Sequence, residues 1–214
     1  MKRIIVLVLV LLLIIPYQST ANEKSDEQKR VDAINQALTA TVKIVPRTKE
    51  IMGVILDPQN GSGFYISPYQ IVTNWHVVRD AASSLWVYRS DGTKCGGKTG
   101  YRDEGRDLAL VTTECEGAPL SIASGAFVGQ DAYAIGNASI DFAVTKGIVV
   151  NVNDMGFLVS DTHVNYGNSG GPLIDSNGAV IGVVKGMLKL DHSFAYAIRI
   201  EDLRLFLRWA GIVS

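Results

Sequence analysis

The stretch Tyr166-Gly167-Asn168-Ser169-Gly170-Gly171-Pro172-Leu173 surrounds one serine with three glycines and then places a proline. Proline excludes a helix at this point, and glycines let the backbone adopt positive φ and approach a bound group closely. Such a loop can aim the backbone N–H groups around Gly167, Asn168 and Ser169 at one point. Converging N–H donors stabilise a developing oxyanion, and the serine hydroxyl beside them is a candidate nucleophile. The alternative is a glycine-rich turn with an incidental serine, and the upstream sequence decides between the two.

Three histidines are candidates for the base that a serine nucleophile needs, namely His76, His163 and His192. His192 follows Asp191, which gives the order serine, acid, histidine of an α/β-hydrolase. That interpretation fails because adjacent residues cannot easily act as orienting acid and base. The glycines and proline after Ser169 also cannot begin the helix that this fold requires. The sequence has no His-Glu-x-x-His motif or His/Cys cluster, so we predict no metal site and no cofactor.

The order histidine, aspartate, serine fits better. His76 follows a strand-like segment, and Asp107 opens the apolar segment 107–111 that lies between His76 and Ser169. An aspartate at the start of an apolar strand is well placed to be partly buried and to hold the N–H of an imidazole ring. Each residue taken alone has an ordinary alternative, His76 in the core or on the surface and Asp107 in a turn.

Short β-branched and apolar segments alternate with Gly, Asn and Asp turns through most of the chain, which predicts an all-β sandwich or barrel. The segments are 41–45, 51–56, 64–66, 85–88, 108–113, 142–152, 157–159, 179–184 and 194–200. Apolar residues at helical spacing predict a short N-terminal helical segment over 22–39, with Val31, Ile34, Ala37 and Leu38 on one face. The same spacing predicts a C-terminal helix over 201–209, with Leu203, Phe206 and Leu207 buried.

The first 21 residues have the pattern of a signal peptide, with Lys2-Arg3, a run of apolar residues over 4–15, Pro16, and small residues ending at Ala21. A run this short cannot span a bilayer, which needs about 20 residues, so an uncleaved anchor is the weaker alternative. We therefore predict a secreted or periplasmic protein that has no membrane association after cleavage. Without Lys2 and Arg3 the chain keeps 18 basic and 21 acidic residues, a net charge of −3. This balance argues against a nucleic-acid partner.

Cys95 and Cys115 are the two cysteines of the chain. Export implies an oxidising compartment, where an even number of cysteines favours a disulfide. The two residues lie symmetrically about Gly105, at the expected tip of a hairpin, so they should face each other across two antiparallel strands. Two free buried thiols are the alternative.

Four blocks of the sequence resemble, in order, the signature blocks of trypsin-like serine proteases, and the bacterial HtrA (Deg) branch is the nearest match. The blocks are Gly61-Ser62-Gly63-Phe64, Thr73-Asn74-Trp75-His76-Val77-Val78, Asp107-Leu108-Ala109-Leu110, and Gly167-Asn168-Ser169-Gly170-Gly171-Pro172-Leu173. The resemblance implies a double six-stranded β-barrel over 40–214, with one barrel at about 40–117 and the other at about 118–200. The PDZ modules usual in that branch are not among these 214 residues. Substrate tethering and PDZ-dependent activation therefore do not carry over.

The resemblance implies a serine endopeptidase that acts on protein or peptide substrates. The first barrel would supply His76 as base and Asp107 as orienting acid, and the second would supply Ser169 as nucleophile. The backbone around Val184, Lys185 and Gly186 would pair with the substrate. The alternatives are a non-hydrolytic peptide-binding or chaperone-like module on the same fold, and, with less support, an esterase. The sequence predicts no oligomeric state.

The residue six before the serine lies near the base of the primary specificity pocket in the family that the chain resembles. Here that residue is His163, followed by Val164, and no Asp or Glu occurs from His163 to Ile174. A buried Arg or Lys of the substrate would have no partner there, so we expect weak cleavage after basic residues and a preference for aliphatic ones. Two alternatives concern His163 itself: protonated, it could admit an acidic side chain, or it could face away from the pocket.

Overall fold

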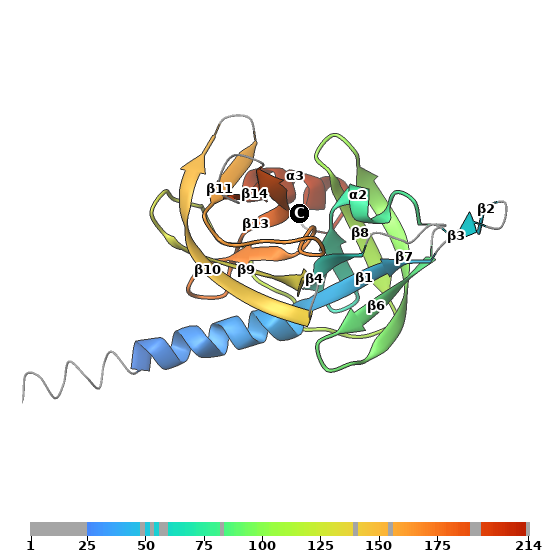
Figure 1. Ribbon diagram of the computed structural model, residues 1–214, viewed down its shortest axis with the longest axis horizontal. Helices are drawn as coiled ribbons and strands as arrows, with labels where there is room; N and C mark the ends of the chain where they lie inside the picture. The colour runs from blue at the N-terminus through green and yellow to red at the C-terminus, as the bar shows by residue number, and fades with distance from the viewer. Residues whose placement is uncertain are drawn as a thin grey trace, which may run out of the picture.

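The computed structural model describes residues 25–47, 50–51, 54–55, 60–81, 84–138, 141–153, 156–188 and 194–212. Two closed antiparallel barrels lie side by side (Figure 1). The first consists of β1 Thr41–Pro46, β4 Gly61–Ser67, β5 Gln70–Thr73, β6 Ser84–Arg89, β7 Lys94–Asp103 and β8 Leu108–Thr113. The second consists of β9 Asp131–Ala138, β10 Asp141–Val152, β11 Phe157–Ser160, β12 Pro172–Ile174, β13 Val180–Leu188 and β14 Phe194–Arg199. The strand orders are β1-β4-β5-β8-β7-β6 and β10-β11-β14-β13-β12-β9.

Each barrel encloses its own apolar interior, because alternate residues of its strands point inward. The first interior is formed mainly by aliphatic side chains and Tyr65, among them Val42, Ile44, Leu85 and Val111. The second includes Val149, Leu158, Leu173 and Ile181. Closure pairs every strand on both sides within its barrel, so neither barrel has a free edge.

A third apolar cluster joins the two barrels. It contains residues of the first barrel such as Phe64 and Leu110, residues of the second such as Ile135 and Ile198, and residues of both terminal helices. Strands that meet here are buried on both faces, since the four consecutive residues Leu108–Val111 are all buried. This shared cluster fixes the relative position of the barrels and therefore of the residues that face each other between them.

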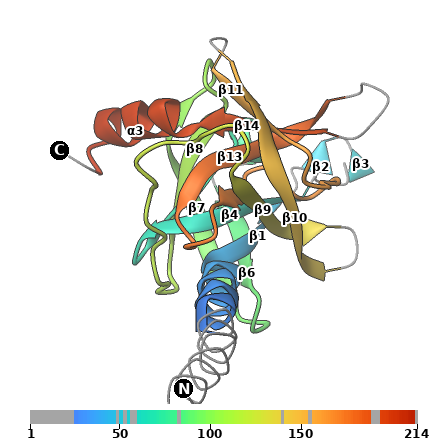
Figure 2. The ribbon, with the colours of Figure 1, turned by 90° about the vertical axis from the view of Figure 1, so that its left-hand side faces the viewer.

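Residues 25–40 form the N-terminal helix, which leads into β1 and extends away from the barrels (Figure 2). Ala37 and Ala40 are buried, and Ile34 and Leu38 pack against the shared cluster. Val31 is 40% exposed, so the apolar face begins at Ile34, one turn later than predicted. The other helices are the four-residue α2 Trp75–Val78 and the C-terminal α3 Ile200–Trp209, which buries Leu203, Phe206 and Leu207 as predicted. Within the described ranges, no helix is long and apolar enough to cross a membrane.

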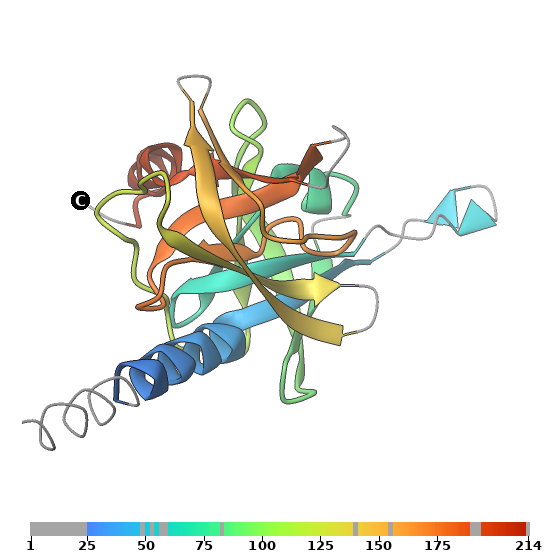
Figure 3. The same cartoon turned by 60° about the vertical axis from the view of Figure 1, so that its left-hand side comes forward.

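The predicted fold class is confirmed: two closed six-stranded barrels with a short N-terminal helix and a C-terminal helix. The segment predicted as one strand at 51–56 overlaps two short strands, β2 Glu50–Ile51 and β3 Val54–Ile55. They form a small sheet that lies apart from the barrels (Figure 3). The strands β7, β9 and β12 did not appear among the predicted segments. The predicted signal peptide, residues 1–21, lies outside the described residues.

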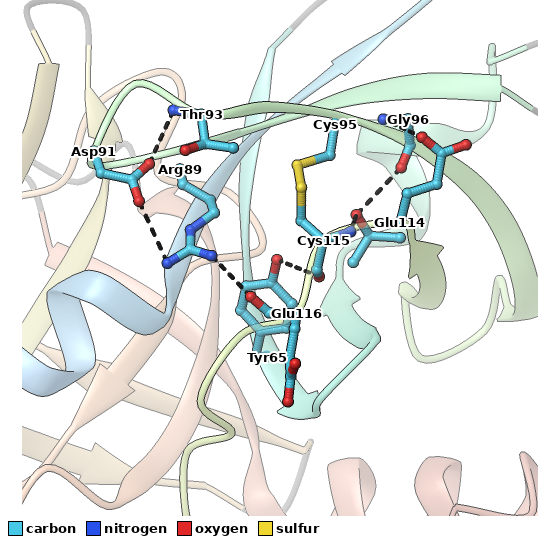
Figure 4. The surroundings of a disulfide bond; sticks show 10 residues. Tyr65, Arg89, Asp91, Thr93, Cys95, Gly96, Glu114, Cys115 and Glu116 are labelled. Atoms are coloured by element: carbon cyan, nitrogen blue, oxygen red, sulfur yellow. Dashed lines mark hydrogen bonds and ion pairs between the residues drawn. A yellow bond between two sulfur atoms is a disulfide. The ribbon is translucent and has the colours of Figure 1, made fainter.

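The two cysteines form a disulfide that links β7 to the segment after β8 (Figure 4). The strand register pairs Gly97 with Thr113, and continuing it by two residues places Cys95 opposite Cys115. The expectation from their symmetry about Gly105 is therefore confirmed. Next to the bridge, the Tyr65 hydroxyl donates a hydrogen bond to the Cys115 carbonyl over 3.1 Å. The bridge closes a segment that contains Asp107.

Candidate functional site

His76 and Asp107 are joined by two hydrogen bonds. The backbone N–H of His76 donates to Asp107 Oδ1 over 2.9 Å, and His76 Nδ1 lies 2.8 Å from Asp107 Oδ2. An ionised carboxylate can only accept, so the proton of this pair resides on Nδ1 and the lone pair of the ring is on Nε2. A histidine held in this tautomer presents Nε2 as a base.

Asp107 occupies an unusual backbone position at the end of the turn 104–107, directly before β8. Among the residues that the structure describes, Asp107 is the only non-glycine residue with positive φ, at 58°. Aspartate tolerates this conformation better than most residues do. Its carbonyl accepts hydrogen bonds from Trp75 N–H over 3.1 Å and from Asn74 Nδ2 over 3.0 Å. The carboxylate and the backbone carbonyl of Asp107 are therefore both bonded to the segment that carries His76, which fixes the relative position of the two side chains.

The Asp107 carboxylate is buried, with 5% of the residue exposed. Burial by itself raises the pKa of Asp107, but the hydrogen bonds from His76 and the charges of His76 and Lys185 outweigh it, so the pKa is held below its usual value. Asp107 also acts on its surroundings: burial, together with the Asp107 charge, raises the pKa of Tyr196.

The loop that carries Ser169 is packed against the segment leading to His76. A Cβ atom added to Gly170 would lie 2.3 Å from Thr73 Oγ1 and 3.0 Å from the Asn74 nitrogen. Gly170 also has φ 86°, so glycine is needed there both for space and for conformation. The loop of Ser169 therefore lies against residues 73–74, directly before the segment that carries His76, at the junction between the barrels.

The Ser169 hydroxyl donates to the Lys185 carbonyl over 3.1 Å. Within the part of the chain that the structure describes, it makes no hydrogen bond to His76 Nε2. Lys185 is the extra residue of a β-bulge in β13, where the register to β14 shifts between Val184 and Gly186. Bulges redirect side chains, and here Lys185 Nζ lies 3.6 Å from Asp107 Oδ2.

The backbone donors of the loop differ in their availability. The Asn168 N–H already donates to the Asn165 carbonyl over 3.1 Å, so the prediction that it contributes to the oxyanion hole is corrected. The N–H groups of Gly167 and Ser169 donate to no acceptor among the described residues. They flank the Gly167–Asn168 peptide and remain free to bind an incoming oxygen.

The residues predicted to bind substrate lie in different surroundings, some buried and others exposed or beside Ser169. Val184 is fully buried, and both its backbone N–H and its carbonyl are bonded to the loop at Gly170 and Gly171, which removes it from the candidates. Val164 is buried in the interior of the second barrel. His163 is exposed, and its ring Nε2 lies 3.3 Å from Asn165 Nδ2. Lys185 and Gly186 remain at the bulge beside Ser169.

A pocket of about 310 Å³ adjoins this bulge and is formed by both barrels and the start of α3. Arg106, next in sequence to Asp107, lies in its wall and is bonded to Asp103 over 2.8 Å and to Asp202 of α3 over 3.2 Å. The pocket is lined by Gly105, Arg106, Gly156, Phe157, Lys185, Ile198 and Asp202. In the described ranges, no three His, Cys, Asp or Glu side chains lie close enough together to hold a metal ion.

The sequence did not single out the side chains of Ser62, Asn74 and Lys185. Ser62 and Asn74 stand inside two of the quoted blocks, but no pattern assigns Ser62 its bonds to the second barrel or Asn74 its bond to the Asp107 carbonyl. Lys185 was predicted for its backbone, and the contact of its ammonium group with Asp107 depends on the bulge. No pattern in the sequence predicts this bulge.

Comparison with known proteins agrees with this arrangement. Residues 61–183 match the family described as trypsin-like peptidase domain. The putative serine protease HhoA of Synechocystis sp. is 35% identical over 179 residues, which cover 75% of this chain and 44% of HhoA. Serine protease HTRA1 of Xenopus tropicalis is 34% identical over 165 residues, which cover 69% of this chain and 35% of that protein. The chain thus spans less than half the length of these curated relatives.

The solved structure of a serine endoprotease from Yersinia pestis superimposes with a TM-score of 0.74 at 26% sequence identity. The alignment covers 86% of this chain and 66% of that one. The two-barrel fold, the His76–Asp107 pair beside the Ser169 loop, and the match over more than half of the chain lead to one assignment: the chain belongs to the trypsin-like peptidase family, among relatives named as HtrA-type serine proteases.

Proposed function

We propose that this protein is an exported serine endopeptidase. The observation that carries the proposal is the pair of hydrogen bonds between His76 and the buried Asp107, next to the glycine-rich loop of Ser169. An ionised aspartate, a histidine held with Nε2 free, and an adjacent serine are the groups that acyl transfer requires. The family membership and the names of the relatives support the same reaction class.

In the proposed mechanism Ser169 Oγ attacks the scissile carbonyl while His76 Nε2 accepts its proton. Asp107 keeps the imidazole in the required tautomer and stabilises the imidazolium ion that forms. The N–H groups of Gly167 and Ser169 bind the oxyanion. His76 then protonates the leaving amine, and water releases the acyl group by the reverse sequence. For this step the Ser169 hydroxyl must leave the Lys185 carbonyl and turn toward His76.

A gel assay with casein and a fluorescence assay with quenched peptides test the proposal. We expect Ser169→Ala, His76→Ala and Asp107→Asn each to lower kcat by about 10⁴ while leaving the fold intact. A fluorophosphonate should label Ser169 in the folded protein and not after denaturation. A protein that binds casein but neither cleaves it nor reacts with the fluorophosphonate would instead be the peptide-binding module considered above.

Export is proposed from the sequence of residues 1–21, which the structure does not describe. Expression in a bacterial host with a working secretion pathway should give a mature protein that begins at Asn22. Intact-mass measurement of the exported protein checks this, and recovery of the full-length chain in the membrane fraction would favour an uncleaved anchor.

A further inference from the structure

Ser62 of β4 lies where the first barrel meets the loop that carries Ser169. It is fully buried, and all of its polar groups are bonded. Its N–H donates to the Ser169 carbonyl over 2.8 Å, and its hydroxyl donates to the Gly167 carbonyl over 2.6 Å. The same hydroxyl accepts the N–H of Asn137 in β9 over 2.8 Å, and the Ser62 carbonyl accepts the Thr73 hydroxyl over 2.6 Å. One residue thus connects both barrels to the two ends of the segment 167–169.

These bonds hold the peptide group that separates the two free oxyanion donors. The peptide between Gly167 and Asn168 is bonded on its carbonyl side to Ser62 Oγ and on its N–H side to the Asn165 carbonyl. Gly167 has φ 99°, and a glycine in that region gains no restriction from a side chain of its own. The orientation of the Gly167 and Ser169 N–H groups therefore depends on the bonds made from outside the loop.

The direction of the hydroxyl is also fixed. A serine hydroxyl has one proton to donate, and the Asn137 N–H already occupies one of its lone pairs, so the proton is left for the Gly167 carbonyl. The surroundings are closely packed: a Cβ added to Gly136 would lie 2.9 Å from Ser62 Oγ, and one added to Gly171 would lie 3.3 Å from Ser62 Cβ. A substituent without a hydroxyl at position 62 would take this partner from two part-buried backbone groups, the Gly167 carbonyl and the Asn137 N–H.

We propose that the Ser62 hydroxyl is a positioning residue that holds the loop in the conformation in which the Gly167 and Ser169 N–H groups converge on the oxyanion. The inference rests on the proposed function, because an oxyanion forms only if the protein catalyses acyl transfer. Preorganised donors act on the transition state more than on the bound substrate, so losing their alignment should lower kcat and leave KM nearly unchanged.

The test compares Ser62→Ala with a matched control, Ser160→Ala. Ser160 of β11 is also fully buried, donates to the Ile148 carbonyl over 2.8 Å and accepts the Thr162 N–H over 3.2 Å, and neither bond is to the loop of Ser169. Both variants should lose thermal stability. We expect Ser62→Ala alone to lower kcat for a quenched peptide by about tenfold or more, with KM within about threefold of wild type. Fluorophosphonate labelling of Ser169 should slow in parallel.

Amide resonances of Gly167 and Ser169 give a readout that does not require turnover. In Ser62→Ala they should shift and broaden, and in Ser160→Ala they should match the wild type. If Ser62→Ala does not fold, Ser62→Cys keeps the shape of the side chain with a weaker donor and should give an intermediate kcat. Unchanged kcat and unchanged amide resonances in a folded Ser62 variant would overturn the proposal. A wild-type protein that never hydrolyses or labels would overturn the proposed function instead, and the resonances would still decide the role of Ser62.

Discussion

At the scale of single residues, the carboxylate of Asp107 is stabilised by two partners from different barrels. His76 is bonded to it directly, and the Lys185 ammonium lies 3.6 Å from Oδ2. Lys185 also packs over the ring of Phe157, with Nζ 5.4 Å from the ring centre. A cation held near a buried carboxylate favours the ionised form of that carboxylate, which is the form that orients the imidazole ring.

The lowered pKa of Asp107 gives a prediction for stability against pH. Because the pKa is lower in the folded state, ionised Asp107 stabilises the fold above the ordinary aspartate pKa of about 3.9. That contribution is lost as pH falls through the lowered folded pKa. Lys185→Met removes one of the lowering charges, so it should raise the Asp107 pKa and move the onset of acid unfolding to higher pH.

Carbon-13 NMR of the Asp107 carboxyl group and circular dichroism along an acid titration measure this effect. Lys146→Met is the matched control, because Lys146 Nζ lies 2.9 Å from the carboxylate of Asp131 and not from Asp107. An Asp107 titration that is identical in the wild type and in Lys185→Met would show that the ammonium group has no influence there.

The position of His163 leads to a prediction on specificity. Its side chain is exposed, its ring pairs with Asn165, and no carboxylate occurs from His163 to Ile174. A basic substrate side chain entering beside Ser169 would find no partner there, and the positive charge of Lys185 is nearby. We expect cleavage after small or medium aliphatic residues, with kcat/KM for Arg or Lys at least about tenfold lower.

A peptide library cleaved at about pH 5.5 and about pH 8, on either side of the usual histidine range, measures this preference. Because His163 is exposed, the same profile is expected at both values and in His163→Ala. A preference for acidic residues that appears only at the lower pH and vanishes in His163→Ala would instead place His163 in the pocket.

The sequence predicted the residues of the candidate site better than their contacts. His76, Asp107 and Ser169 stand in blocks whose order is recognisable, and the structure brings these blocks together at the barrel junction. The ammonium of Lys185 and the hydroxyl of Ser62 act across that junction. Their partners depend on a bulge and on the register between strands far apart in sequence, which residue patterns do not encode.

At the scale of secondary-structure elements, β7 shows where sequence patterning failed. The strand Lys94–Asp103 contains three glycines and little apolar alternation, so it lacks the signal of a half-buried strand. It forms because β6 and β8 pair with it on both sides and close the barrel. The cysteine spacing did indicate it, since two cysteines facing each other require strands on both sides of Gly105.

The disulfide between Cys95 and Cys115 reinforces this hairpin. It links residues 20 apart in sequence, for which the chain-entropy model gives about 3 kcal/mol. We expect the double variant Cys95→Ala, Cys115→Ala to lose about that much unfolding free energy in urea, and to lose activity because Asp107 lies within the closed segment. The reductant dithiothreitol should reproduce the loss in the wild type and change nothing further in the double variant. Equal stability of the reduced and oxidised wild type would contradict the prediction.

At the scale of the whole molecule, the cluster between the barrels makes the protein a single unit. The proposed site takes His76 and Asp107 from the first barrel and Ser169 from the second, so its geometry depends on this contact. Helix α3 contributes directly: Phe206 is fully buried, and its ring centre lies 5.3 Å from that of Tyr101 in β7. The C-terminal helix, which follows the last strand of the second barrel, thus packs on the first.

This arrangement predicts that both barrels unfold in one transition. Trp86 of β6 and Trp209 of α3 are fluorescent probes of the first barrel and of the C-terminal helix, and Phe substitutions at the other tryptophans isolate each signal. Phe206→Ala should lower the unfolding free energy by about 3–5 kcal/mol, because it removes a buried ring from the shared cluster. Both probes should report the same shifted midpoint in urea, since the lost contact belongs to both barrels. Exposed Phe127→Ala, at 68% exposure, is the control and should leave the midpoint unchanged. Separate midpoints for the two probes would show that the first barrel and the C-terminal helix unfold in different transitions, and would contradict the prediction.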